Sequence, residues 1–470
     1  MRGSAPALAL LLAVATALIT LVTALGPRRT LTALHLGLFL LFATVSSWRL
    51  MLPLLAPRRR SRALQGLSEW PAYTIIVPLR DEAAMAAQIL NGLRALDYPA
   101  DRLDALLVVE ADDIATRDAL IAARLPPFAR VLVAPPGGPT TKPRACNLAL
   151  REATGELVVV YDAEDEPDPG QLREAAARFA KAPARLACLQ APLRIHPRED
   201  FIGRQFALEY AALFEVVLPA LARMGLPFPL GGTSNHFRRS ALDAVGGWDA
   251  FNVTEDADIG FRLAAEGFTA GVLRSPTFES APDTLESWLP QRTRWLKGYV
   301  QTWSTAMRAP RRGGLRRFLA LQTTLGLSIV TGVLHGPLVL VAVAAGLVAL
   351  TDLNASAVFW ADLVLVGFSW VSAAALMAEG ADRAGFARRP RDLIAAVAYW
   401  PIQSLAAAFA VHQLFVSPFR WDKTPHRPRI TAPVEALPAL DPVAPFGVTI
   451  PGERRRRPDL RKRPRAAARA

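Results

Sequence analysis

Cysteine is scarce in this sequence, and the residue patterns of several common protein classes are missing. Only two cysteines occur among 470 residues, Cys146 and Cys188, so a disulfide framework is excluded and a reducing compartment is expected. The six histidines show no zinc-binding spacing. Neither a Gly-x-x-x-x-Gly-Lys phosphate-binding loop nor a Gly-x-Ser-x-Gly nucleophile motif is present, and no internal repeat is evident. The sequence therefore argues against a disulfide-rich secreted protein, a zinc protein, a P-loop nucleotidase and a serine hydrolase of that type.

Acidic residues are outnumbered by basic ones, but much of the excess gathers at one end. The formal net charge is +13, and residues 452–470 hold nine Arg or Lys against two acids, about half of that excess. No interleaving of basic and aromatic residues and no nucleic-acid-binding motif occurs, so no nucleic-acid partner is expected. A basic tail beside membrane helices instead indicates attraction to anionic headgroups, which makes membrane lipids an expected partner.

Hydrophobic residues make up 52% of the chain although 20% are charged, so the two kinds must be separated along the sequence. Residues 5–25 are almost purely apolar and long enough to span a bilayer, and a second apolar run covers residues 31–55. The first run alone also fits a signal peptide. Because the second follows so closely, we expect residues 1–57 to form a transmembrane hairpin. The hairpin would put two arginines outside and four inside, namely Arg28 and Arg29 against Arg58, Arg59, Arg60 and Arg62.

A second membrane region is expected at residues 316–418. Its apolar runs cover residues 318–350, 357–377 and 394–416, and the loop at residues 379–392 carries four arginines, which favours the cytosol. Three crossings would leave the basic tail, residues 419–470, on the opposite side from that loop. Either the last run is re-entrant or interfacial, or the first run hides two crossings divided at Pro337. The tail itself is expected to be cytoplasmic and largely disordered.

Residues 70–308 alternate strand and helix patterns, which is typical of an α/β domain. The expected elements are strands at residues 73–78, 103–109, 130–134 and 157–160, and helices at residues 82–96 and 142–152. Several of these strands end in polar or charged residues. Open α/β sheets bind their ligands at the carboxyl ends of their strands, so a ligand site is expected there.

The strand Leu157-Val158-Val159-Val160 leads into the most acidic stretch of the chain. Five acids follow within seven residues, at positions 162, 164, 165, 166 and 168. Packed carboxylates repel one another unless a cation lies among them, and a divalent cation that holds a phosphate would serve. The competing interpretation is a solvated acidic turn.

Six short motifs occur in a fixed order between the membrane runs. They are Val-Pro-Leu-Arg-Asp-Glu at 77–82, Glu-Ala-Asp-Asp at 110–113, Lys142 with Asn147, Asp-Ala-Glu-Asp at 162–165, Thr-Glu-Asp at 254–256 and Gln-Arg-Thr-Arg-Trp at 291–295. Each is short, but the ordered set resembles the catalytic domain of membrane-embedded family 2 inverting glycosyltransferases, which include cellulose and hyaluronan synthases. The resemblance implies an α/β GT-A-type nucleotide-sugar-binding domain, here flanked by transmembrane α-helices.

The resemblance assigns residues to the donor side of the site. Asp112 or Asp113 would hydrogen-bond the uracil or ribose of the donor, although an aspartate there can instead cap the helix that follows. Lys142 and Arg294 would contact the diphosphate, Arg294 through its fixed fork of donors.

A metal site is implied at the acidic strand end. Asp162 and Glu164 stand where the family has Asp-x-Asp and would bind Mg²⁺ or Mn²⁺, with Asp162 also near the sugar. The second acid is glutamate here, a departure from the family, and Asp165 is a competing ligand.

The resemblance also implies an acceptor side. Asp256 matches the general base, which removes the proton of the acceptor hydroxyl as its oxygen attacks the anomeric carbon; the alternative is an acid in the first turn of a helix. Glu255, Gln291 and Trp295 would meet the acceptor. An amphipathic interfacial helix around Trp295 is the other interpretation, and it is compatible with the first.

We therefore predict a family 2 hexosyltransferase that passes several times through the cytoplasmic membrane, with its catalytic domain and tail in the cytosol. It would transfer a sugar from a nucleotide-sugar donor, a UDP-hexose, with inversion onto a growing β-linked polysaccharide, together with secretion or export partner proteins. The first alternative is a single addition to a lipid-linked acceptor, favoured by the small number of spans. The second is a membrane protein that binds nucleotide sugar without catalysis, and such a binder needs no base.

Overall fold

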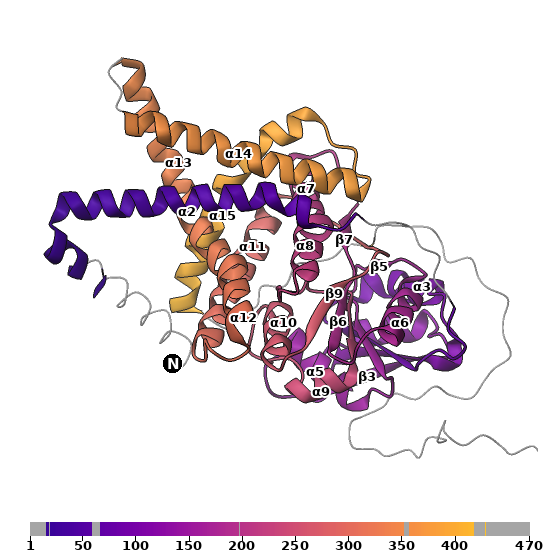
Figure 1. Cartoon of the computed structure of the whole chain (residues 1–470). Helices are drawn as coiled ribbons and strands as arrows, with labels where there is room; N and C mark the ends of the chain where they lie inside the picture. Colours follow the sequence, from indigo (N-terminus) through magenta and orange to yellow (C-terminus); the bar gives the residue numbers. More distant parts are fainter. Residues whose placement is uncertain are drawn as a thin grey trace, which may run out of the picture.

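The computed structural model describes residues 16–17, 19–58, 66–196, 198–351 and 357–417, together with residue 428. In Figure 1 a mixed α/β domain stands beside a group of long helices. Apart from residue 428, the expected tail at residues 419–470 lies outside the described residues, as does most of the first apolar run. The described end of that run, residues 19–25, is helical and stops at Gly26, whose φ of 77° favours glycine.

The α/β domain is built on a seven-stranded sheet in the order β3-β2-β1-β4-β8-β6-β9. Its strands are β1 (Tyr73–Leu79), β2 (Leu103–Glu110), β3 (Ala129–Ala134), β4 (Leu157–Val160), β6 (Leu186–Gln190), β8 (Asn235–Arg238) and β9 (Thr269–Val272). Strands β3, β2, β1 and β4 are parallel, and β8 runs antiparallel to its neighbours β4 and β6. The four strands expected from the sequence form this parallel half. A second sheet joins β5 (Glu166–Pro167), β10 (Thr277–Glu279) and β7 (Leu193–Ile195).

Helices cover both faces of the large sheet. They are α3 (Ala86–Ala95), α4 (Ile114–Ala122), α5 (Lys142–Glu152), α6 (Gln171–Lys181), α7 (Phe201–Ala212), α8 (Leu218–Arg223), α9 (Arg239–Val245), α10 (Glu255–Ala265) and α11 (Leu285–Met307), with 3₁₀ turns at Ala83–Met85 and Ala100–Arg102 and a π-helix at Leu213–Val217. The β-branched run of β1 has no polar alternation because both of its faces are buried: Ile75 and Val77 pack in one hydrophobic core and Ile76 in the other.

Five described stretches are long and apolar enough to cross a membrane. They are α2 (Pro27–Leu55), Phe201–Arg223, Gly314–Leu347, α14 (Ala357–Ala384) and α15 (Pro390–Val416). The third contains α12 (Gly314–Leu321), a π-helix at Gln322–Gly326 and most of α13 (Leu327–Thr351). Phe201–Arg223 is 78% buried inside the fold, whereas the other four are between 6% and 28% buried. It is therefore a core helix of the protein, and the other four carry the apolar surface.

The last apolar run keeps close to the sheet domain at both ends. Near its start, Asp392 of α15 accepts hydrogen bonds from Arg204 of α7 at 3.0 and 2.5 Å. Near its end, Gln413 accepts one from Lys297 of α11 at 2.9 Å. In Figure 1, α15 lies crosswise to α2 and α14. Helix α13 runs through Pro337 without a break, so the apolar run at residues 318–350 is not divided at the proline.

Candidate active site

A cavity of about 170 Å³ opens at the carboxyl ends of β1, β2 and β4. Its walls come from these strand ends, the N-termini of α5 and α10, the second sheet and one face of α11. Eight residues singled out in the sequence line it: Lys142, Asp162, Glu164, Glu255, Asp256, Gln291, Arg294 and Trp295. Motifs spread over more than half the domain thus meet at one sheet edge, as expected for an open α/β sheet.

Lys142 is held in the cavity by an ion pair. It is the first residue of α5 and precedes Pro143, which suits a helix start because the first amide groups need no partner within the helix. Its Nζ lies 2.5 Å from Oδ1 and 2.7 Å from Oδ2 of Asp162, and donates to the carbonyl of Gly232 at 2.6 Å. Burial alone lowers the pKa of Lys142, but the carboxylates of Asp162 and Glu255 outweigh it, so the pKa is raised and the ammonium stays charged.

Asp165 fixes the turn that follows β4. Its Oδ2 accepts a hydrogen bond from the backbone N–H of Asp162 at 2.7 Å and another from the hydroxyl of Thr233. Burial, together with the charges of nearby acids, holds the pKa of Asp165 well above its usual range. Asp165 is not among the residues that line the cavity, whereas Asp162 and Glu164 are. Asp165, the competing metal ligand in the sequence analysis, therefore fixes the turn that carries Asp162 and Glu164.

Glu279 lines the cavity as well, and sequence reasoning missed it. It ends β10, whose Phe278 pairs with Glu166 of β5 just beyond the acidic turn. Burial, followed by the charges of Glu164 and Asp162, raises the pKa of Glu279 well above its usual value. The one local signal is an acid at the end of a short strand pattern, and nothing in that pattern shows that β10 joins β5.

The charge balance of the cavity suits a cation. Its acidic lining residues are Glu82, Glu110, Asp162, Glu164, Glu255, Asp256 and Glu279, and its cations are Arg80, Lys142 and Arg294. A divalent ion near Glu164 and Glu279 would relieve the repulsion that raises the pKa of Glu279. Among the described residues, no three His, Cys, Asp or Glu side chains are grouped so that they could hold a metal by themselves. Further oxygens, such as those of a diphosphate, would have to complete its shell.

Asp256 and Glu255 stand in the first turn of α10, with Thr254 as the N-cap. Asp256 accepts a hydrogen bond from the backbone N–H of Ala257 at 2.7 Å. Burial raises the pKa of both carboxyls, and the charge of Asp256 adds to the rise at Glu255. A carboxylate with a raised pKa accepts a proton more readily than an exposed one, which suits a general base.

Helix α11 supplies the wall opposite the strand ends. Gln291, Arg294 and Trp295 face the cavity. Arg292 points to the other side, where its two terminal nitrogens donate to Glu209 of α7 at 2.7 and 2.6 Å. Helix α11 thus forms the cavity wall on one face and packs on α7 with the other.

The two aspartates expected at the nucleotide lie outside the cavity lining. Asp113 is buried, caps α4 by accepting from the Thr116 N–H at 3.2 Å, and also accepts from the Asp81 N–H at 2.6 Å. The capping interpretation therefore describes Asp113. Asp112 is exposed, and its carboxylate accepts two hydrogen bonds, at 2.6 and 3.1 Å, from Arg80, which does line the cavity.

The fold defines a class of protein. The structure aligns with that of the mannosyltransferase PcManGT from Pyrobaculum calidifontis, solved in complex with GDP-Man and Mn²⁺, over 84% of this chain and 98% of that one, with a TM-score of 0.53 and 21% identity. The domain thus has the GT-A-type fold expected from the motifs. Residues 157–410, more than half of the chain, match the model of the glycosyl transferase family group 2, and the chain belongs to that family. It is a family 2 glycosyltransferase.

Several characterised or named proteins are similar over part of the chain. A probable glycosyltransferase, YdaM of Bacillus subtilis, is 24% identical over 237 residues, which are 50% of this chain and 56% of YdaM. The beta-monoglucosyldiacylglycerol synthase of Synechocystis is 29% identical over 49% of this chain and 48% of its own length. Cellulose synthase 2 of Novacetimonas hansenii is 27% identical over 50% of this chain but 15% of its own length. The chain thus spans about half the length of the first two relatives.

The contact between α11 and Thr254 generates a testable prediction. A Cβ added to Gly298 would lie 2.2 Å from Oγ1 of Thr254, the residue before Glu255 and Asp256. Gly298→Ala should push α11 away from α10 and reduce sugar transfer about 100-fold, the cost of displacing a reacting group by about 1 Å. The measurement is the rate of sugar transfer in membranes containing equal amounts of folded protein.

Gly332 of α13 provides the matched control. A Cβ there meets its nearest neighbour at 3.6 Å, an ordinary contact, so Gly332→Ala should transfer sugar at the normal rate. Normal transfer by Gly298→Ala would mean that the fit between α11 and Thr254 does not control the site.

Proposed function

We propose that the protein transfers a hexose from a nucleoside diphosphate sugar, a UDP-hexose, to a hydroxyl acceptor at the membrane surface with inversion at the anomeric carbon. The observation that supports this most directly is the shared cavity. It brings the half-buried carboxylate of Asp256 together with two cations suited to a diphosphate, Lys142 and Arg294. A protein that only binds nucleotide sugar has no need of the base.

The reaction assigns a step to each residue. Asp256 accepts the proton of the acceptor hydroxyl while that oxygen forms a bond to the anomeric carbon and the bond from that carbon to the diphosphate breaks. Lys142 and Arg294 stabilise the charge that develops on the departing nucleoside diphosphate. Gln291 hydrogen-bonds the acceptor: within the described residues its buried Oε1 has no hydrogen-bond partner, so an acceptor hydroxyl can donate to it. Glu255 and Trp295 line the same end.

Mg²⁺ or Mn²⁺ would be held by Asp162 and Glu164, with Glu279 nearby, and would neutralise charge on the diphosphate when bound. The ligands of the similar PcManGT structure, GDP-Man and Mn²⁺, are compatible with this arrangement. Because side chains in the described part of the chain form no three-ligand group by themselves, we propose that the cation and the nucleotide bind together. Asp112 completes the donor side by orienting Arg80.

The arrangement of the helices favours a lipid-linked acceptor over a growing polysaccharide. We propose that α2, α13 and α14 cross the membrane and that α15 lies along its surface, since both ends of α15 contact the sheet domain. Arg383, Arg388 and Arg389 then lie on the same side as the sheet domain, which supports a cytosolic catalytic domain at residues 70–308 and membrane regions at 1–57 and 316–418.

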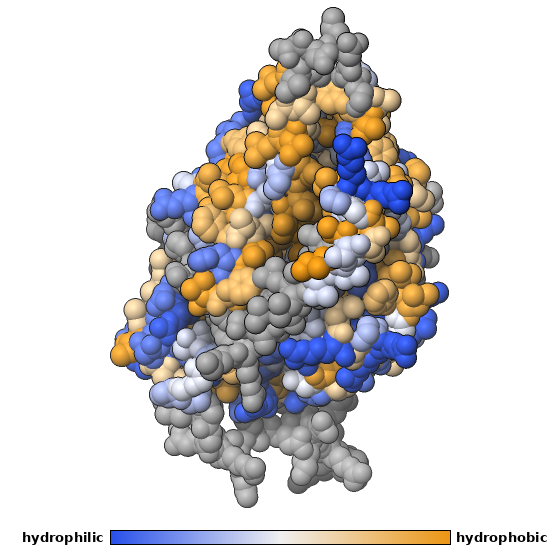
Figure 2. Space-filling view, turned by 90° about the vertical axis from the view of Figure 1, so that its left-hand side faces the viewer, coloured by the Kyte–Doolittle hydropathy of each residue, from blue (hydrophilic) through white to orange (hydrophobic). Residues whose placement is uncertain are grey.

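A cavity of about 190 Å³ among these three helices supports the same acceptor class. Apart from His35, His335, Asp362 and Ser369, its lining is apolar, and His35 and Asp362 pair with each other at 3.3 Å. Figure 2 looks at this end of the molecule, where hydrophobic residues predominate around a hollow. A hydrated glucan needs a polar path, whereas a lipid chain fits an apolar one. The similar protein named a beta-monoglucosyldiacylglycerol synthase is compatible with a glycolipid product.

The first prediction concerns the base. Asp256→Asn should reduce transfer by at least about 100-fold, because the amide cannot accept a proton. Binding of UDP, measured by calorimetry, should persist. Since burial raises the pKa of Asp256, the rate of the unmodified protein should fall with decreasing pH at a higher midpoint than an exposed aspartate would give. The control is Asp243→Asn, on the exposed surface of α9; a normal rate in the Asp256 variant would reject the assignment.

The second prediction concerns the metal. UDP should bind the purified protein more tightly in Mn²⁺ than in EDTA. The Glu164→Gln variant should lose that difference because it removes one charged ligand, while its affinity in EDTA should stay the same. Glu266→Gln, a change at a residue that is not among those lining the cavity, is the control. Equal metal dependence in the Glu164 variant would exclude Glu164 as a ligand.

The third prediction concerns the acceptor class. With a radiolabelled UDP-hexose, membranes containing the protein should produce label that extracts into organic solvent and carries one added sugar. Membranes containing the Asp256→Asn variant provide the background. Label that precipitates as a long polymer would support the polysaccharide synthase instead, and a scan of UDP- and GDP-sugars in the same assay identifies the donor.

A further inference from the structure

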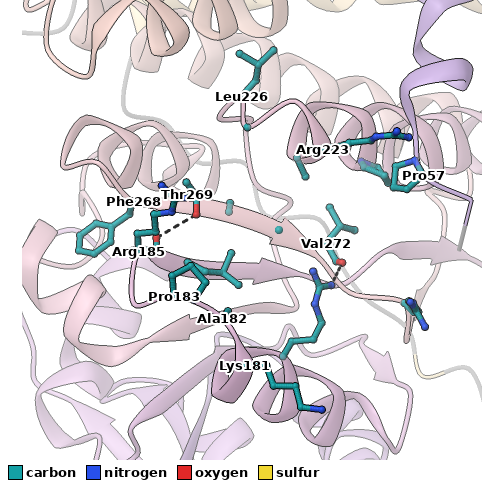
Figure 3. Close-up of a pocket in the computed structure, with 18 of the residues that line it drawn as sticks. Pro57, Lys181, Ala182, Pro183, Arg185, Arg223, Leu226, Phe268, Thr269 and Val272 are labelled. Atoms are coloured by element: carbon teal, nitrogen blue, oxygen red, sulfur yellow. Dashed lines mark hydrogen bonds between the residues drawn. The ribbon is translucent and has the colours of Figure 1, made fainter. Parts of the chain in front are cut away.

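A large groove of the described structure lies away from the active site. It measures about 1000 Å³ and runs between the end of α2, helix α8, the edge strand β9 and helix α6. Figure 3 shows Pro57 and Arg223 on one side of it, Thr269 and Val272 along β9, and Lys181 and Arg185 on the other side. None of the motifs that form the catalytic cavity contributes to this groove.

The groove is strongly basic. Its ionisable lining residues are six cations, Arg58, Arg178, Lys181, Arg185, Arg223 and Arg274, and one acid, Glu174. The carboxylate of Glu174 accepts hydrogen bonds from the N–H groups of Arg274 and Ser275 and from the Ser275 hydroxyl. Glu174 therefore holds the backbone at Arg274 and Ser275 in place. With six cations against this one acid, the groove keeps a large excess of positive charge. Burial lowers the pKa of Arg178; the charge of Glu174 offsets part of that shift, and the like charge of Arg274 adds to it.

The groove begins where α2 ends. At 29 residues, α2 is about 44 Å long, whereas the hydrocarbon core of a bilayer is about 30 Å thick, so its last turns extend to headgroup level. Arg223 donates a hydrogen bond to the carbonyl of Leu55, the last residue of α2, at 3.4 Å. Arg58 follows three residues later and also lines the groove. One rim of the groove is thus joined to the end of a membrane helix.

The geometry points to a binding site for the phosphate-bearing headgroups of anionic phospholipids in this groove, which we call the basic groove. Phosphate oxygens pair with the cations of its walls, while Leu226 and Phe268 offer apolar surface to the glycerol and upper acyl chain. Bound headgroups hold the sheet domain against the membrane. This proposal does not depend on the reaction or acceptor assigned above.

A lipid fits the basic groove better than a soluble anion or an acidic protein segment. Each Lys or Arg near an anionic membrane surface adds to the attraction, and here the charges adjoin the level at which α2 leaves the bilayer. A soluble phosphate would use the charges but leave the apolar surface uncovered. An acidic peptide would have to compete with the lipids that lie at the rim joined to α2.

The test measures binding of a fluorescent phosphatidylglycerol to the full-length protein in neutral detergent micelles. Three exposed cations of the basic groove are neutralised together in the variant Lys181→Gln, Arg185→Gln and Arg274→Gln. We expect its affinity to fall about 100-fold, since each surface cation contributes roughly fivefold to binding an anionic membrane. Phosphatidylcholine with the same acyl chains should bind weakly to both proteins, and added salt should weaken the phosphatidylglycerol complex.

A matched variant carries three substitutions outside the basic groove, Arg117→Gln, Arg124→Gln and Arg151→Gln, and should bind phosphatidylglycerol as the unmodified protein does. UDP binding in Mn²⁺ confirms that each variant is folded. Equal phosphatidylglycerol affinity in both triple variants would overturn the proposal. So would displacement of the lipid by glycerol phosphate at similar concentration, which would indicate a soluble phosphate site, or binding of polyglutamate without binding of phosphatidylglycerol, which would indicate an acidic protein partner.

Discussion

The ion pair between the buried Arg292 and the largely buried Glu209 is the contact on which the arrangement of the active site depends. Besides its two hydrogen bonds to Arg292, Glu209 accepts one from the hydroxyl of Tyr399 on α15 at 2.8 Å, and the Arg292 guanidinium lies 4.5 Å from the ring centroid of Trp295. Breaking a buried pair by removing one partner costs about 3–5 kcal/mol, because the other charge is left uncompensated. Rotation or sliding of α11 would break this pair, so α7 and α15 together fix which face of α11 meets the cavity. The Arg292–Glu209 pair therefore holds Gln291, Arg294 and Trp295 in position. Of these three residues, only Trp295 contacts the pair, through the ring face next to Arg292.

The same helix reaches the proposed base. Further along α11 than Arg292, Gly298 packs so closely on Thr254 that no side chain fits between α11 and the start of α10. The first turn of α10 carries Glu255 and Asp256. A single rigid element therefore sets both the aromatic wall and the distance to the carboxylate, and it is itself set by its packing on α15. Any change in the membrane-side helices that moves α15 is transmitted to the cavity through packed contacts.

The sequence predicts the parts of this structure that local patterns determine. The β-branched runs of β1 and β4, buried on both faces, and the start of α5 before Pro143 were found because their signals lie within a few residues. Glu279 was missed because its place in the cavity depends on the pairing of β10 with β5, which is distant in the sequence. The capping role of Asp113 could not be separated from a ligand role, since both need an aspartate after a strand. Hydropathy could not tell whether α15 crosses a membrane, because crossing and in-plane helices have similar composition; its contacts with Arg204 and Lys297, which support the proposed in-plane position, join residues distant in the sequence.

The proposed in-plane position of α15 would also let α2, α13 and α14, the described helices proposed to cross the membrane, serve the proposed transferase. Trp295 in the cavity wall belongs to α11, which packs against α15. In the proposed arrangement the cavity therefore opens beside a helix at the membrane surface and not above a pore. A lipid hydroxyl then has to reach Asp256 from headgroup level without passing through the bilayer. The distance from the headgroups to Asp256 depends on how the sheet domain is tilted relative to the membrane, because the cavity and the end of α2 lie at different places along that domain. Headgroups bound in the basic groove beside α2 would oppose such a tilt, so a site remote from the chemistry would keep the acceptor within reach of the base.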